Sequence, residues 1–79
     1  MSHPPDERVW VDASPLLKAV ARREVQVDVF GVNLERSYQR AQTNRRVTLH
    51  DADRLAVRLL GEHPAMVWGP AWWMAQGVS

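Results

Sequence analysis

Residues 48–61, TLHDADRLAVRLLG, have the clearest helical pattern in the chain, with a start, an apolar stripe and a stop. Thr48 and Asp51 form an approximate capping box, with Asp where Glu is usual, and Gly61 suits the position just past a helix C-terminus. The apolar residues recur at helical spacing; they are Leu49, Ala52, Leu55, Ala56 and Leu59. This segment therefore predicts an amphipathic helix that buries one face.

Prolines and glycines divide much of the remaining sequence into further short helices. Ser14 suits an N-cap and Pro15 a first helical position, which predicts a helix over about residues 15–24. His63 is interpreted as an N-cap-like residue, and Pro64 opens the segment PAMVW. After Gly69 a second proline opens AWWMAQ. We expect residues 1–8 to be a disordered tail, 9–76 one domain that begins with a short extended arm carrying Trp10 onto the body, and 77–79 a frayed tail.

The segment 24–33 fits two patterns. Val25, Val27 and Val29 alternate with polar residues, as in a half-buried strand, but Val25, Val29 and Val32 also recur at helical spacing. A lone strand without a partner would leave its edges unpaired. We therefore predict a short helix that ends before Gly31, then a turn, then a helix that is capped by Asn33 and begins at Leu34.

Basic charge is concentrated in residues 33–46, NLERSYQRAQTNRR, where four arginines face one glutamate while the whole chain has a net charge of +1. On a helical wheel, Leu34, Tyr38 and Ala41 share one sector. The opposite sector carries Arg36, Gln39, Arg40 and Thr43. Arginine binds guanine edges or phosphates bidentately and glutamine pairs with adenine, so this face has the residue types of a nucleic-acid reading helix. The alternative is an ordinary solvated face.

Length and composition limit the other functions. A chain of 79 residues without cysteine forms one small domain, with no disulfides and no thiolate metal sites. Asp51 and Asp53 point about 200 degrees apart on a helix, and Ser14 and Ser37 have no nearby base, so we expect no enzyme, no metal and no cofactor. No segment has the apolar length of a membrane span, and the N-terminus lacks a signal-peptide pattern. We expect a soluble, cytoplasmic, all-α protein: a compact bundle of four to five short helices.

The order of a short helix, the turn Gly31–Val32–Asn33, a basic helix and a capped apolar helix resembles the lambda-repressor-like helix-turn-helix domains of Cro and C1 type. The segment RRVTLHDADRLAVRLLGEHPAMVWGPAWW is similar to the ending of small helix-turn-helix proteins of actinobacteria and their phages. The likeness covers about residues 14–73. Two positions depart from the family pattern: Ser37 stands where an apolar residue is usual, and Val27 where a small one is. The departure at Ser37 predicts either a longer turn or a helix rolled by about 100 degrees.

The resemblance implies a sequence-specific protein that binds double-stranded DNA, of the kind used as a Cro-like or immunity repressor or as an excisionase-like architectural factor. The helix that begins at about Leu34 would enter the major groove. The base-reading residues would be Arg36, Gln39 and Arg40, with Asn33 and Glu35 secondary; a salt bridge from Glu35 to Arg40 or Arg23 is the alternative. The phosphate contacts would be Arg23, Thr43, Asn44, Arg45 and Arg46.

The tryptophans support a second function. Three of the four lie in the last twelve residues, and Trp72 and Trp73 are adjacent, so both cannot face inward on one helix. One of the pair could cover a partner, either a second copy of the chain or another protein. The alternative function is therefore a small interaction module that binds and modulates a host protein through Trp72 and Trp73, and the other reading of the pair is a partly covered hydrophobic lid.

Overall fold

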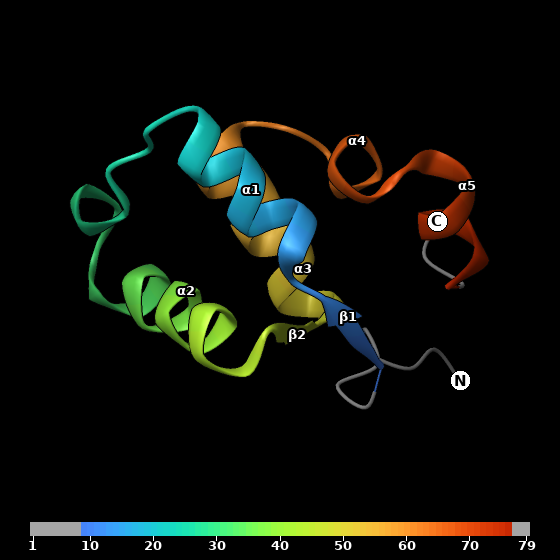
Figure 1. Ribbon diagram of the computed structural model, residues 1–79, viewed down its shortest axis with the longest axis horizontal. Coiled ribbons are helices and arrows are strands. Elements are labelled where there is room, and N and C mark those ends of the chain that lie inside the picture. Colours follow the sequence, from blue (N-terminus) through green and yellow to red (C-terminus); the bar gives the residue numbers. More distant parts are fainter. Residues whose placement is uncertain (1–8, 77–79) are drawn as a thin grey trace, which may run out of the picture.

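Nine short elements follow one another in residues 9–76, the part of the chain that this computed structural model describes (Figure 1). The elements are β1 (Trp10–Asp12), α1 (Ser14–Arg22), the 3₁₀ turn η1 (Val27–Phe30), α2 (Val32–Asn44), β2 (Arg46–Thr48), α3 (Leu49–Leu55), the π-helical turn η2 (Ala56–Leu60), α4 (Pro64–Trp68) and α5 (Pro70–Ala75). Helices dominate, as expected. The tails expected at 1–8 and 77–79 lie outside the described residues. Among the described helices, none has the length and apolar character required to cross a bilayer.

The capped helix predicted over 48–61 is confirmed as α3 and its continuation η2. The hydroxyl of Thr48 accepts a hydrogen bond from the backbone N–H of Asp51 at 3.1 Å. Gly61 ends η2 in the left-handed conformation, with φ of 65°, which glycine adopts without steric cost. All five residues of the predicted stripe are buried. Local sequence signals therefore determine both ends of this element.

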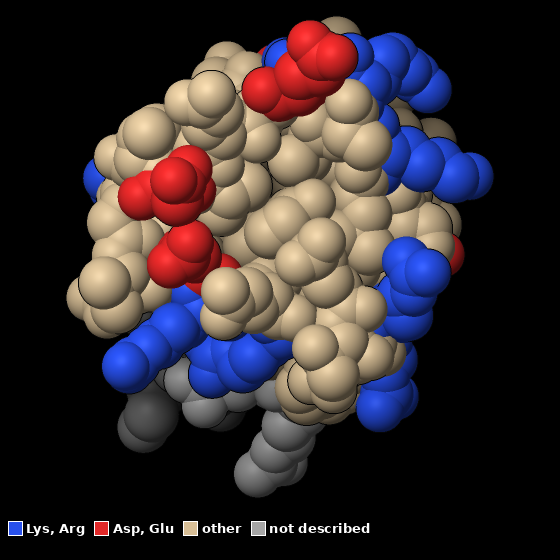
Figure 2. Space-filling view, turned by 60° about the vertical axis from the view of Figure 1, so that its left-hand side comes forward, with Lys and Arg blue, Asp and Glu red and all other residues tan. Residues whose placement is uncertain are grey.

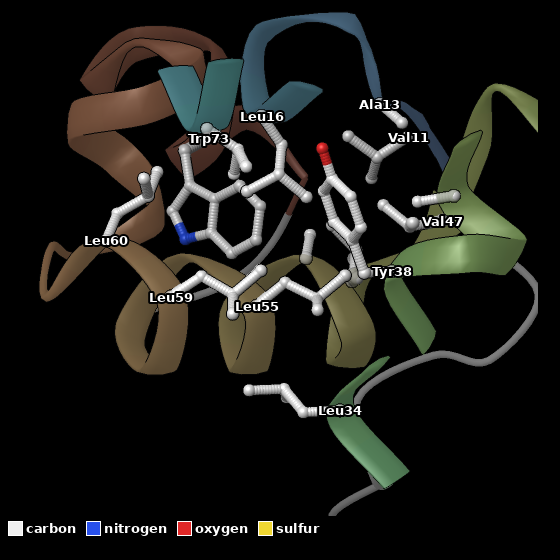
Figure 3. Close-up of a cluster of buried hydrophobic side chains, with 14 residues drawn as sticks. Val11, Ala13, Leu16, Leu34, Tyr38, Val47, Leu55, Leu59, Leu60 and Trp73 are labelled. Carbon is white, nitrogen blue, oxygen red and sulfur yellow. The ribbon is translucent and has the colours of Figure 1, made fainter. Parts of the chain in front are cut away.

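Two aromatic rings fill the centre of the core (Figure 3). The figure shows the indole of Trp73 and the ring of Tyr38 on either side of Leu16, above Leu55 and Leu59. These side chains come from α5, α2, α1, α3 and η2, so one small core joins most of the helices. Each large ring removes roughly 150–250 Å² from water, which is substantial for a domain of this size.

The C-terminal helices begin at the two predicted prolines. His63 caps α4, because its Nδ1 accepts a hydrogen bond from Ala65 N at 3.0 Å. Trp68 stacks on Trp73 with ring centres 5.9 Å apart, and its Nε1 donates to the carbonyl oxygen of Asp12 at 2.7 Å. Trp73 is 1% exposed whereas Trp72 is 42% exposed, which confirms that only one of the pair faces inward.

The fold is mainly helical, as predicted, but it also contains a small two-stranded antiparallel sheet that was not predicted. The extended arm predicted around Trp10 is present as β1. Val11 pairs with Val47 in the register and both are buried, whereas the Trp10 side chain is 51% exposed and so packs on the body only in part. The guanidinium of Arg46 lies 5.3 Å from the centre of the Trp10 ring instead. The two strands lie far apart in the sequence, so local patterns did not indicate that they pair.

The segment before α2 agrees with the prediction in part. The short helix predicted to end before Gly31 is present, but it is a single 3₁₀ turn that covers Val27–Phe30 only, and the alternating strand does not form. Gly31, with φ of 108°, makes the change of direction alone, in a region that side-chain-bearing residues rarely adopt. As a result α2 begins at Val32, two residues before Leu34, and Asn33 lies inside the helix and does not cap it.

Helix α1 begins as predicted but is capped differently and ends earlier, at Arg22. Ala13 is the N-cap residue, so the predicted N-cap role of Ser14 is wrong. The carboxylate of Asp12 accepts hydrogen bonds from the N–H of Ser14 at 3.1 Å and from its hydroxyl at 2.9 Å. These bonds, with Lys18 and Arg45 nearby, lower the pKa of Asp12 below its usual value of 3.8.

Replacement of Thr48 by alanine should destabilise the domain by about 1 kcal/mol, because the Asp51 N–H loses its cap. The measurement is the free energy of unfolding from urea denaturation. Thr43→Ala is the matched control, since Thr43 is exposed within α2 and caps nothing. An equal or smaller loss for Thr48→Ala than for Thr43→Ala would contradict the assignment of the cap.

Burial raises the pKa of the Tyr38 hydroxyl above its usual 10.0. The folded state therefore holds this proton more tightly than the unfolded state, so the contribution to stability is complete below pH 10.0 and is lost as pH rises through the folded-state pKa. Urea denaturation over a series of alkaline pH values should show a steeper loss of stability for wild type than for Tyr38→Phe. Parallel losses in the two proteins would refute this account.

Candidate nucleic-acid interface

Helix α2 has one buried face and one exposed face. The buried residues are Leu34, Ser37, Tyr38 and Ala41. Arg36, Gln39, Arg40 and Thr43 are exposed on the other side, as the helical wheel predicted. Asn33 and Asn44 are also exposed, near the two ends of the helix. The packing of α2 thus presents its polar residues outward as one surface.

These exposed residues line a single open groove, which we call the α2 groove. It is formed by Asn33, Arg36, Ser37, Gln39, Arg40, Thr43, Asn44 and Arg54. The lining contains three arginines and three amide side chains but no carboxylate. Such a surface can donate many hydrogen bonds and attracts anions. Six of the predicted site residues therefore come together here, from Asn33 to Asn44.

Ser37 is buried on α2, with 1% of its surface exposed. Its hydroxyl oxygen accepts a hydrogen bond from the guanidinium of Arg40 at 3.3 Å and another from the guanidinium of Arg54 on α3. Helix α2 begins directly after Gly31 and buries both Ser37 and Tyr38. The serine occupies an inward position with its polar atom satisfied by arginines.

The sequence analysis did not identify Arg54 as a site residue. It lies on α3 outside the predicted apolar stripe, so helical periodicity gives no reason to select it. Its place in the groove depends on how α2 crosses α3. The Nε of Arg54 is buried without a hydrogen-bond partner, and the side chain also lines a neighbouring hollow with Asn33 and Arg58.

Four other predicted DNA contacts do not line the groove. Arg23 is held at the end of α1, where its guanidinium donates to the carbonyl oxygen of Leu60 at 3.1 Å and pairs with the carboxylate of Glu62. Its predicted phosphate role therefore lacks support from its position. Glu35 is half-buried, and neither of the salt bridges considered for it, to Arg40 or to Arg23, forms. The remaining two predicted contacts outside the groove are Arg45 and Arg46.

Arg45 and Arg46 are exposed just beyond the Asn44 end of the groove. Arg45 is the C-cap residue of α2, with φ of 60°, and its N–H donates to the carbonyl of Ala41 at 2.9 Å. Arg46 lies in β2 against Trp10. Both residues follow the C-terminal end of α2 in the sequence, and neither lines the α2 groove.

Charged side chains are unevenly distributed over one face of the molecule. Figure 2 shows Lys and Arg side chains along one edge and the lower part of the face, around a largely uncharged centre, with the acidic groups mostly at the opposite edges. Within residues 9–76, the ion pair that the structure contains joins Arg23 to Glu62, and none involves Arg36, Arg40 or Arg54. The arginines of the α2 groove are therefore not neutralised by carboxylates of the described chain.

Comparison with known proteins found no matching family model, no matching curated protein and no matching solved structure. The resemblance to Cro- and C1-type domains therefore stays a prediction, and the site rests on its own geometry and charge.

Proposed function

We propose that this protein binds double-stranded DNA by inserting the exposed face of α2 into the major groove. The observation that supports this proposal best is the α2 groove, in which three arginines, a glutamine, two asparagines and a threonine line one surface that includes no carboxylate. A solvated face made only for solubility more often alternates acidic and basic residues. Phosphate oxygens and base edges are the ligands that suit this set of donors.

The spacing on α2 suits base reading. Arg36, Gln39 and Arg40 follow one another at i, i+3 and i+4, so they lie side by side on the helix surface. The B-DNA major groove is about 12 Å wide and admits one α-helix. In that position, arginine can bond the O6 and N7 atoms of guanine, and glutamine the N6 and N7 atoms of adenine. Arg45 and Arg46, beyond the C-terminal end of α2, would reach the backbone.

The element order supports a regulator as the kind of DNA-binding protein. We infer that η1, Gly31 and α2 act as a shortened helix-turn-helix, in which one 3₁₀ turn stands where the family has a scaffold helix. The chain would then work as a small phage-type transcriptional regulator, such as a Cro-like or immunity repressor. Arg36 and Gln39 would specify the operator.

Selection from a random duplex library should yield one enriched motif. Arg36→Ala should weaken binding to that motif by about 1–3 kcal/mol, or roughly 5- to 150-fold, because a bidentate base contact is lost. The control is Arg22→Ala, which removes the same charge from an exposed position at the end of α1. The measurement is fluorescence anisotropy at several salt concentrations. No enriched motif, or equal losses for the two variants, would sink the proposal.

The second candidate function is contact with a protein partner, and the exposure of Trp72 favours it. Trp72 is 42% exposed, with Met66 at 69% and Met74 at 57% also exposed on α4 and α5. Figure 1 places these helices at the opposite end of the molecule from α2, so contact there would leave the α2 groove free. Trp73 is buried in the core and has no surface to offer a partner, so the predicted interface role applies to Trp72 alone.

This candidate predicts a homodimer that depends on Trp72. Trp72→Ala should weaken self-association by about 2 kcal/mol, or roughly 30-fold, as for a tryptophan at the centre of an interface. Sedimentation equilibrium over a concentration series measures the effect, and Trp10→Ala serves as a control because that tryptophan is exposed on β1. A wild-type protein that stays monomeric throughout would rule out the homodimer.

A further inference from the structure

Two arginines from different helices converge on one buried hydroxyl. Arg40 comes from α2 and Arg54 from α3, and the guanidinium of each donates a hydrogen bond to the Oγ of Ser37. A serine oxygen has two lone pairs, so it accepts both bonds at once. The two cationic groups are thereby held close together at the wall of the α2 groove.

This arrangement is electrostatically incomplete. Like charges that share one neutral acceptor repel each other, and within residues 9–76 neither guanidinium forms an ion pair with a carboxylate. The Nε of Arg54 adds a second anomaly, because it is buried without a hydrogen-bond partner. The same is true of the Nε1 of Trp73 in the core, but the Arg54 side chain differs in that it also lines the α2 groove, where a ligand can supply an acceptor. An anion with several acceptor oxygens would offset the repulsion and bond both guanidinium groups.

We propose that Arg40 and Arg54 together bind one phosphate group of the DNA backbone, and that Ser37 positions them. The inference rests on the proposed function, and it changes the role of Arg40 from base reader to phosphate ligand. Phosphate contacts set the register of a protein on the duplex, whereas base contacts specify the sequence. The shared phosphate contact of Arg40 on α2 and Arg54 on α3 would therefore fix the depth at which Arg36 and Gln39 meet the bases.

The surroundings of Arg54 suit a backbone path. Arg54 and Asn33 line both the α2 groove and an adjoining hollow, which Arg58 also lines. We propose that a DNA strand bound along the α2 groove and this hollow would contact Arg40, Arg54 and Arg58 in turn. Because the three arginines come from α2, α3 and η2, the strand would bridge separate elements of the fold.

The test is a scan of the selected duplex with methylphosphonates, which replace one charged phosphate at a time by a neutral group. One position should weaken the binding of wild type about ten-fold and weaken the binding of Arg54→Gln clearly less, because in the variant only Arg40 still contacts that phosphate. The slope of log K against log salt should also fall by about 0.9 in Arg54→Gln. Arg22→Gln, with the same change of charge, should keep both the slope and the sensitive position.

Ser37 variants separate positioning from charge. Ser37→Ala keeps every arginine but loses the shared acceptor, so the sensitivity to the same methylphosphonate should fall several-fold, and Ser37→Thr should restore it. Thermal melting of each variant shows whether the protein is folded. If wild type binds DNA in an Arg36-dependent manner but Arg54→Gln keeps the full salt slope and the full ten-fold effect at the sensitive position, the phosphate site is wrong. The proposed function would then still stand. If wild type binds no duplex, both are wrong.

Discussion

The packing of Tyr38 and Ala41 into the core determines which side of α2 faces the solvent. These residues meet side chains from α1, α3 and the β1–β2 sheet, so α2 cannot roll without exposing a large aromatic ring. Loss of such a ring from a core typically costs about 3–5 kcal/mol, which approaches the net stability of a domain of this size. The polar face of α2 is therefore held outward by the same contacts that hold the fold together.

The contact between α2 and α3 includes a buried polar residue, Ser37, at a position where an apolar residue is usual. Ser37 is as deeply buried as the core leucines, and its hydroxyl is satisfied by Arg54 and Arg40. A hydrophobic side chain at this position would leave both guanidinium groups without their acceptor. The serine links the interior of the domain to the α2 groove, so the fold and the proposed site share one interaction.

The parts of the fold that depend on short-range signals could be predicted from the sequence. The caps at Thr48, His63 and Gly61 are local, and the opposite orientations of Trp72 and Trp73 follow from helix geometry. The pairing of β1 with β2 and the contact of Arg54 with α2 could not be predicted, because both join segments distant in the sequence. The start of α2 was missed because Gly31 makes the turn alone. The sequence identified the face of α2 that forms the groove but not the arginine of α3 that completes it.

The most direct test of the central claim is to map DNA binding on the folded protein. Titration of the selected duplex into isotope-labelled protein, followed by NMR of the backbone amides and arginine side chains, would locate the contact surface. The account predicts that the largest shifts fall on Asn33 to Asn44 and on the Arg54 side chain, with little change in α4 and α5. Shifts centred on Trp72 and Met74, or none at all, would contradict it.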